Sequence, residues 1–176
     1  MAETLREAKF ELRSAERALG RMRSASDFDS FEDAWRQYLV ALQKVWVKTE
    51  RGCQPVRESF EPWQGKFKRQ RQKDQLLRYL RHARNADEHS IQLILDDIPG
   101  QTVTTSSGDT VYVGNSIVTT SPRIALLPVE DRGKWYNPPA EHLGKALAKR
   151  DPLKVAELGL TFYADFVEQA ERKFFE

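Results

Sequence analysis

Apolar residues recur every three or four positions in several stretches of the chain, which is the spacing of one face of an α-helix. The first stretch covers residues 5–22, and the second covers residues 31–50. The last covers residues 152–174 and is rich in aromatic side chains. We predict an amphipathic helix over each stretch, with a turn at about residues 24–29 between the first two.

Residues that favour helix ends lie beside these stretches. Ser30 and Asp33 have the spacing of a capping box at the start of the second helix, and Gly52 follows its end. Asp151 precedes Pro152, a pair that is typical of an N-cap and a first helical position. Because the connection between the first two helices is short, we predict that they pack antiparallel.

The stretch from residue 64 to residue 95 contains no proline and, after Gly65, no glycine. Its apolar residues keep the spacing of a helix. We predict that it forms the longest helix of the protein, either straight or kinked, after a segment at residues 55–62 that begins and ends with proline.

The pattern changes after residue 100, where short runs of β-branched residues alternate with turn-forming sequences. Residues 128–139 are rich in proline and glycine, and they predict a loop that Trp135 and Tyr136 attach to the bundle. A short helix is predicted over residues 140–149. The β-branched runs predict a small antiparallel meander, with strands at residues 102–105, 110–113, 116–119 and 124–127.

Together these elements predict a mainly α protein. The expected architecture is an antiparallel helical bundle of four to five helices, with a small antiparallel β meander inserted before the last helices. A length of 176 residues suits one domain with its own core. We therefore predict a single domain over residues 1–176, with the β insertion at residues 101–128.

Composition excludes several classes of protein. No apolar run approaches the roughly 20 residues of a membrane span, and the N-terminal sequence shows no secretory signal. We therefore expect a cytoplasmic protein with no membrane partner. One cysteine and three histidines are too few for a disulfide framework or a zinc finger. The motifs of P-loops, dinucleotide-binding folds, serine hydrolases and zincins are absent from the sequence.

One segment is strongly basic although the net charge of the whole chain is only +2. Residues 64–84 contain eight basic residues and a single acid, Asp74. Because clustered positive charge binds polyanions with release of counterions, RNA is the partner that we expect. The alternative is a solvated helix face paired with acids such as Glu58 and Glu61. The candidate RNA-binding residues are Lys66, Lys68, Arg69, Arg71, Lys73, Arg78, Arg81 and His82.

Charged residues also fall where the helical pattern after residue 76 predicts the core. A helical wheel puts Asp87 within the apolar stripe and Arg84 at its edge. Burying two charges is costly unless they are paired or used in function, and an Arg84–Asp87 ion pair is the purely structural interpretation. The opposite face carries the polar residues Arg78, His82, Asn85 and His89.

The segment RNADEH, from Arg84 to His89, resembles the signature of the HEPN superfamily. In that signature an Arg is followed by a polar residue and, four to six residues after the Arg, by a His. Asn85 gives the match much of its specificity, because only about one residue in ten of this chain is Asn, Asp or His. The resemblance covers residues 28–98 and 152–175, and the β insertion is extra to it.

The resemblance implies a metal-independent endoribonuclease, acting as a toxin or an antiviral effector, that cleaves RNA by attack of the 2′-hydroxyl on the adjacent phosphodiester. His89 would transfer protons, Arg84 would hold the scissile phosphate, and Asn85 would orient both. No metal or other cofactor is implied. The implied partners are RNA, a second copy of the chain, and an antitoxin or regulatory protein.

A homodimer follows from helix geometry as well. Arg84 and His89 are five residues apart, which places them about 140° apart around one continuous helix. One copy is therefore not expected to form the site alone. Two copies related by a two-fold axis can bring both pairs of residues into one cleft.

Three other interpretations fit the sequence. One is a non-catalytic HEPN-like domain that binds RNA or protein. Another is an adaptor that binds protein through the meander edge and through Trp135 and Tyr136. The third is a metal site built from Asp87, His89 and the adjacent pair at residues 96–97, which lacks a recognisable ligand spacing.

Overall fold

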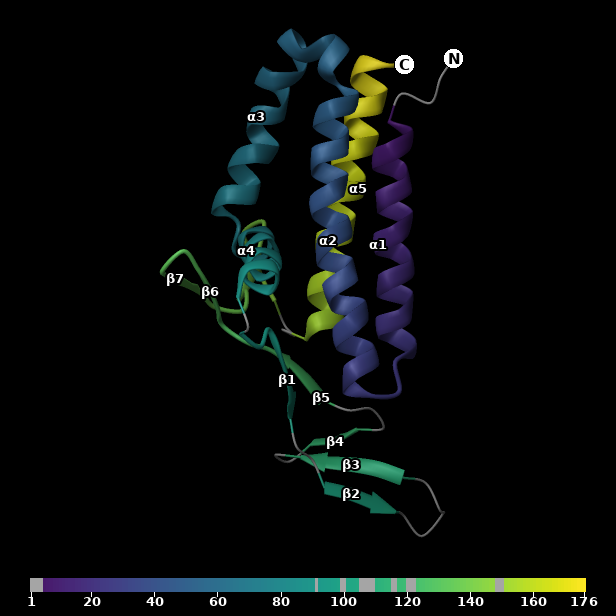
Figure 1. The fold of residues 1–176 in the computed structure, drawn as a ribbon, viewed down its shortest axis with the longest axis vertical. Helices are drawn as coiled ribbons and strands as arrows, with labels where there is room; N and C mark the ends of the chain where they lie inside the picture. The colour runs from purple at the N-terminus through teal and green to yellow at the C-terminus, as the bar shows by residue number, and fades with distance from the viewer. Residues whose placement is uncertain are drawn as a thin grey trace.

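The structure is a computed structural model that describes residues 5–90, 92–98, 101–104, 110–114, 117–119, 123–147 and 151–176. Within these ranges the chain is mainly helical, as predicted. In Figure 1, α1, α2 and α5 run side by side, and α3 and α4 lie on one side of them. The helices are α1 (Arg6–Ser24), α2 (Phe28–Gly52), α3 (Arg57–Lys73), α4 (Gln75–His89) and α5 (Pro152–Phe174), with a 3₁₀ turn at Gln54–Val56.

Three of the four predicted β runs form one antiparallel sheet in chain order. Its strands are β2 (Gln101–Thr104), β3 (Thr110–Gly114) and β4 (Ile117–Thr119). The fourth run, β5 (Arg123–Leu126), pairs instead with β1 (Leu95–Ile98). Residues 105 and 116 of the predicted runs lie outside the described residues.

Two short hairpins follow the meander. The first joins β6 (Val129–Asp131) to β7 (Lys134–Tyr136), and the second joins β8 (Glu141–His142) to β9 (Lys145–Ala146). Both replace other predictions, since residues 128–139 were expected to be loop and residues 140–149 helix. Residues 148–149 of that expected helix lie outside the described residues.

The same type of turn explains both hairpins. Arg132 and Gly133 have φ of +53° and +75°, and Leu143 and Gly144 have φ of +48° and +77°. Positive φ at both central residues of a two-residue turn matches the twist of the flanking strands. The first central position here holds Arg or Leu rather than the usual Asn or Asp, so the sequence does not display a hairpin signal.

The predicted long helix at residues 64–95 is wrong in its boundaries and its continuity. Asp74 has an extended conformation with ψ of 131°, which ends α3, and its carboxylate accepts a hydrogen bond of 2.9 Å from the backbone N–H of Leu77 to cap α4. α3 also begins earlier than predicted and contains Pro62. The buried Ile94 and Leu95 lie beyond α4, which ends at residue 89.

The caps of the other helices agree more closely with the sequence. Asp151 caps α5 by accepting a hydrogen bond of 2.9 Å from the backbone N–H of Lys154, as predicted. The cap of α2 is Asp27 rather than Ser30, because the Asp27 carboxylate accepts a bond of 2.7 Å from the Ser30 N–H. The turn between α1 and α2 is therefore only three residues long.

All five helices contribute to the core, and one of its closest contacts is where α5 meets α2 and α4. A Cβ atom on Gly159 would lie 2.6 Å from Leu80 of α4 and 2.9 Å from the Tyr38 hydroxyl of α2, so this position holds the three helices together only as glycine. The buried Tyr38 hydroxyl donates a hydrogen bond of 2.6 Å to the carbonyl of Ala156. This packing fixes one side of α4 and leaves its polar side for the hairpins. None of the described helices is long and apolar enough to cross a membrane.

Candidate functional site

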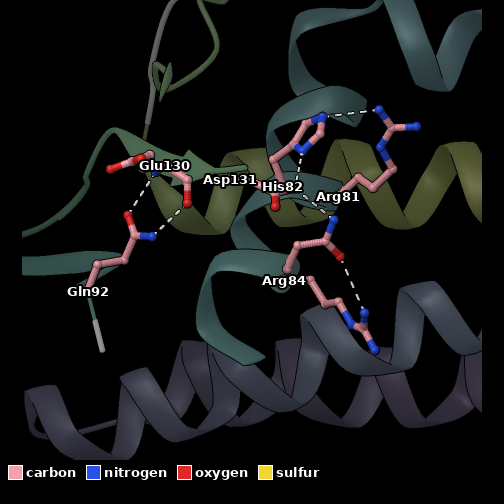
Figure 2. Close-up of polar contacts among 7 residues, drawn as sticks. Arg81, His82, Arg84, Gln92, Glu130 and Asp131 are labelled. Atoms are coloured by element: carbon pink, nitrogen blue, oxygen red, sulfur yellow. Dashed lines mark hydrogen bonds and ion pairs between the residues drawn. The ribbon is translucent and has the colours of Figure 1, made fainter. Parts of the chain in front are cut away.

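The β6–β7 hairpin packs on the polar face of α4. Tyr136 stacks on His82, with ring centroids 3.6 Å apart and an angle of 9° between the planes. Val129, the partner of Tyr136 across the hairpin, is fully buried. Gln92, just after α4, donates a hydrogen bond of 2.7 Å to the carbonyl of Glu130 and accepts one of 2.8 Å from its N–H (Figure 2). The hairpin is thus attached to α4 at several points.

Asp131 of β6 is the polar centre of this contact. Its Oδ2 atom lies 2.6 Å from Nδ1 of His82 and 2.9 Å from Nδ2 of Asn85. Only 8% of the Asp131 side chain is exposed. Burial alone would raise the pKa of Asp131, but the hydrogen bonds from Asn85 and His82 together outweigh burial and lower the pKa. Asp131 is therefore a carboxylate under ordinary conditions.

The donors and acceptors around His82 determine its tautomer. The guanidinium of Arg81 only donates, and it lies 3.1 Å from Nε2 of His82, so Nε2 is an acceptor and carries no proton. Nδ1 then carries the proton and donates to Asp131. Burial, chiefly, and the nearby Arg81 and Arg78 charges lower the pKa of His82 against the opposing effect of Asp131. His82 is consequently neutral near pH 7.

The same reasoning fixes the orientation of Asn85. A carboxylate only accepts hydrogen bonds, so the amide nitrogen of Asn85 faces Asp131 and the amide oxygen faces the other way. That oxygen accepts a hydrogen bond of 3.3 Å from the guanidinium of Arg84. A chain of directed hydrogen bonds therefore runs from the hairpin to the predicted phosphate-binding residue.

Arg84 has a second fixed contact and one unmet donor. Its Nη2 atom lies 2.6 Å from the carboxylate of Glu88, one turn further along α4. Its Nε–H is buried and has no acceptor among the described residues, which costs roughly 1–3 kcal/mol. Groups held at such a cost are more frequent at functional sites than elsewhere.

Asp87 does not pair with Arg84, so the purely structural interpretation of these two charges names the wrong partners. Its carboxylate lies 2.7 Å from the guanidinium of Arg36 on α2, which also pairs with Glu32 at 3.1 Å. Burial raises the pKa of Asp87, and the Arg36 charge opposes this effect. The inward charge on α4 is therefore compensated by the neighbouring helix, and Asp87 is a structural residue.

His89 is the last residue of α4, and its side chain is exposed. It lines an open depression of about 510 Å³ together with Asn85 and the hairpin residues 130–132. Arg84 does not line this depression. This arrangement agrees with the angular separation expected from the sequence.

The basic cluster divides into exposed and buried parts. Arg71 is only 7% exposed and lies 4.0 Å above the ring of Trp46, while its guanidinium donates to Tyr163 and Gln43. Arg71 therefore belongs to the core and not to a surface that could bind RNA. Arg81 is half-buried against His82. The exposed members are Lys66, Lys68, Arg69, Lys73 and Arg78.

Asp131 and Gln92 are the site residues that the sequence did not indicate. Asp131 contacts α4 residues that are 46 and 49 positions away in the sequence, so no local pattern of residues could predict this contact. Within the part of the chain that the structure describes, no three His, Cys, Asp or Glu side chains are grouped as metal ligands. Comparisons of the chain with models of protein families, with curated proteins and with solved structures find no match.

Proposed function

We propose that this protein is a metal-independent endoribonuclease of the HEPN type, which cleaves RNA at a site shared by two copies of the chain. The observation that carries the proposal is the hydrogen-bonded chain from Asp131 through Asn85 to Arg84. It orients the amide of Asn85 on the face of α4 that also carries the exposed His89, and it fixes the guanidinium of Arg84 at the edge of that face.

The chemistry needs a proton carrier and a positive charge on one phosphate. The 2′-hydroxyl attacks the adjacent phosphorus atom and loses its proton to a base, and the 5′-oxygen leaves and takes up a proton. One His89 accepts the proton of the 2′-hydroxyl, and water protonates the leaving 5′-oxygen. Arg84 stabilises the charge that develops on the phosphate. The products are a 2′,3′-cyclic phosphate and a 5′-hydroxyl, so DNA is not cleaved.

The shared site follows from the separation of Arg84 and His89 within one chain. A two-fold axis beside the polar face of α4 lets Arg84 of each copy approach His89 of the other. The Glu88 carboxylate, now paired with Arg84, must give way to the incoming phosphate. The proposed partners are thus a second copy of the chain and RNA, with an antitoxin or regulatory protein in the cytoplasm.

The Arg84–Glu88 ion pair favours a second candidate. A guanidinium already neutralised at 2.6 Å is less available to a phosphate. A non-catalytic RNA- or protein-binding adaptor would keep the same residues for structure. This candidate predicts that RNA is bound and released uncut.

Cleavage assays in EDTA separate the two candidates. The purified protein should cut single-stranded RNA and leave cyclic phosphate ends, whereas His89→Ala and Arg84→Ala should each lower the rate at least about 10²-fold. Arg17→Ala, an exposed arginine of α1, is the matched control and should cleave normally. A folded His89→Ala protein that cleaves at the normal rate would refute the proposed roles.

Mixing variants tests the shared site independently. A dimer formed from one Arg84→Ala copy and one His89→Ala copy still contains one intact Arg and one intact His. Its mixed interface should restore part of the cleavage that each variant lacks alone. Size-exclusion chromatography with light scattering should show a dimer, and a monomer that cleaves RNA would exclude the shared site.

A further inference from the structure

Trp135 is exposed although it lies on a strand that is firmly attached to the core. Tyr136 attaches this segment to the bundle as predicted, but the same prediction is wrong for Trp135. Its relative exposure is 66%, the highest among the exposed large apolar residues of the described chain. Successive side chains of a strand point to opposite faces of the sheet. Tyr136 faces α4, as does Asp131 on the paired strand, so the side chain of Trp135 faces outward. Covering an exposed indole with another apolar or planar group is favourable, because it removes the ring from water. Trp135 is therefore a candidate for stacking with a ligand.

The hairpin presents this indole on a rigid support. Asp131 is hydrogen-bonded to α4, Tyr136 is stacked on His82, and the backbone of Glu130 is bonded twice to Gln92. Because these contacts hold the strand before any ligand binds, stacking on Trp135 would require little ordering of the protein. The cost of binding is correspondingly small.

The charges around Trp135 favour an anionic polymer. Arg132 and Lys134 at the turn are exposed, and Lys134 shares the face of its partner Asp131 rather than that of Trp135. On that same face, Arg78 of α4 lies 5.9 Å from the Tyr136 ring centroid. Glu130 pairs with Trp135 across the hairpin and would repel a phosphate on that side. Phosphate contacts therefore fall to the turn, while the indole face is left for a base.

The hairpin also adjoins the proposed cleavage site. Arg132 and Asp131 line the depression that contains His89. A strand that reaches His89 through this depression would pass the turn of the hairpin. Trp135 does not line the depression itself, but it follows the turn by two residues and can contact the strand beyond Arg132.

We propose that the β6–β7 hairpin is a binding site for single-stranded RNA, in which an unpaired base stacks on Trp135 and the flanking phosphates contact Arg132 and Lys134. This inference rests on the proposed function for the identity of the polymer. It adds a substrate class, since a base within a duplex cannot stack on the indole.

Binding measurements with a cleavage-inactive protein test this site. The probe is a fluorescein-labelled 12-nucleotide RNA without secondary structure, bound to His89→Ala protein and followed by fluorescence anisotropy. Adding Trp135→Ala should weaken binding about tenfold or more, and Trp135→Phe should retain most of the affinity. Phe10→Ala, which removes an aromatic residue of α1 that is 51% exposed, is the matched control and should bind normally.

Two further measurements separate stacking from charge. Replacing Arg132 or Lys134 with alanine should each reduce the salt dependence of binding by a slope of about 0.7. Binding of a 12-base-pair RNA duplex should be unchanged by Trp135→Ala. Equal binding of the single strand by the Trp135→Ala protein and its parent would overturn the inference, and would direct attention to a protein partner for the exposed indole.

The outcomes also distinguish this inference from the proposed function. If the wild-type protein cleaves RNA but Trp135→Ala changes neither binding nor cleavage of single strands, only the hairpin site is wrong. If single strands bind through Trp135 but no RNA is cleaved, only the nuclease is wrong. A wild-type protein that does not bind RNA refutes both.

Discussion

Replacing Asp131 with alanine removes the acceptor at the centre of the contact between α4 and the hairpin. The N–H groups of His82 and Asn85 both donate to the same carboxylate oxygen, Oδ2. A hydrogen bond to a charged group contributes roughly 1.5–3 kcal/mol. Because Asn85 is only half-buried, its amide can donate to water once the carboxylate is gone, so the loss of its hydrogen bond costs less than that range. We expect the free energy of unfolding to fall by about 2–4 kcal/mol.

The loss should be visible in a thermal unfolding curve. For a protein of this length, about 1 kcal/mol corresponds to roughly 2–4 °C in melting temperature. Asp131→Ala should therefore lower the midpoint by about 5–15 °C, measured by circular dichroism at 222 nm. Glu130→Ala, which removes an exposed carboxylate on the same strand, should shift it by no more than about 2 °C.

Asp131→Asn separates geometry from charge. Both donors approach Oδ2, so an asparagine with its oxygen in that place keeps both hydrogen bonds and loses only the charge. We expect a loss of about 1 kcal/mol for this variant. In the cleavage assay the alanine variant should be slower than its folded fraction explains, because Asn85 is no longer oriented toward Arg84. A melting temperature of the alanine variant equal to that of the wild type would refute the reasoning.

Three further predictions concern other residues. Leu143→Asn should raise the melting temperature by about 2–4 °C, because asparagine tolerates the positive φ that leucine holds there at a cost of about 1 kcal/mol. His82→Phe should flatten the dependence of stability on pH between about 7 and 5. The lowered pKa of His82 means that the unfolded chain takes up a proton first, so acidification destabilises the wild type by up to about 1.4 kcal/mol per pH unit. Arg71→Ala should destabilise the fold by about 2–4 kcal/mol without changing the salt dependence of RNA binding. Replacing the exposed Lys73 with alanine should leave the stability unchanged and reduce the salt dependence of RNA binding.

Each of these has a control or a contrary result. Leu143→Ala keeps the positive φ, so it should not stabilise the hairpin. A wild type whose urea midpoint is constant from pH 7 to 5 would show that His82 does not titrate as its burial implies. An Arg71→Ala protein as stable as the wild type would contradict the stacked, hydrogen-bonded position of this side chain in the core.

The helices could be predicted because their signals are local. The apolar stripes of α1, α2 and α5 and the cap at Asp151 are visible within a few turns of sequence. The break at Asp74 was missed because a single aspartate is compatible with a helix interior, and its role is decided by distant partners. His142 and the N–H of Leu143 bind its carboxylate at 2.9 and 2.6 Å and hold it out of the helix.

The candidate site was predictable to the same extent. Arg84, Asn85 and His89 form a local motif on one helix, so their spacing could be recognised. The role of Asp131 could not be recognised, because a contact between a short strand and a helix 46 residues apart produces no periodic pattern in the sequence. The wheel also placed Asp87 correctly on the inner side of α4, but its partner, Arg36, depends on how α2 crosses α4.

The β strands between α4 and α5 form two groups with different relations to the site. The hairpin at residues 129–136 is bonded to α4, whereas the β2–β4 sheet lies beyond the end of the bundle, away from α4 (Figure 1). Ile98 is paired with Arg123 across β1 and β5, so an Asn-Gly turn in place of residues 99–122 can join the two strands directly. We expect this shortened chain to keep the melting temperature and the RNA cleavage of the full one. Loss of cleavage with the fold intact would place part of the substrate contact in the β2–β4 sheet and move the specificity of the enzyme away from the hairpin.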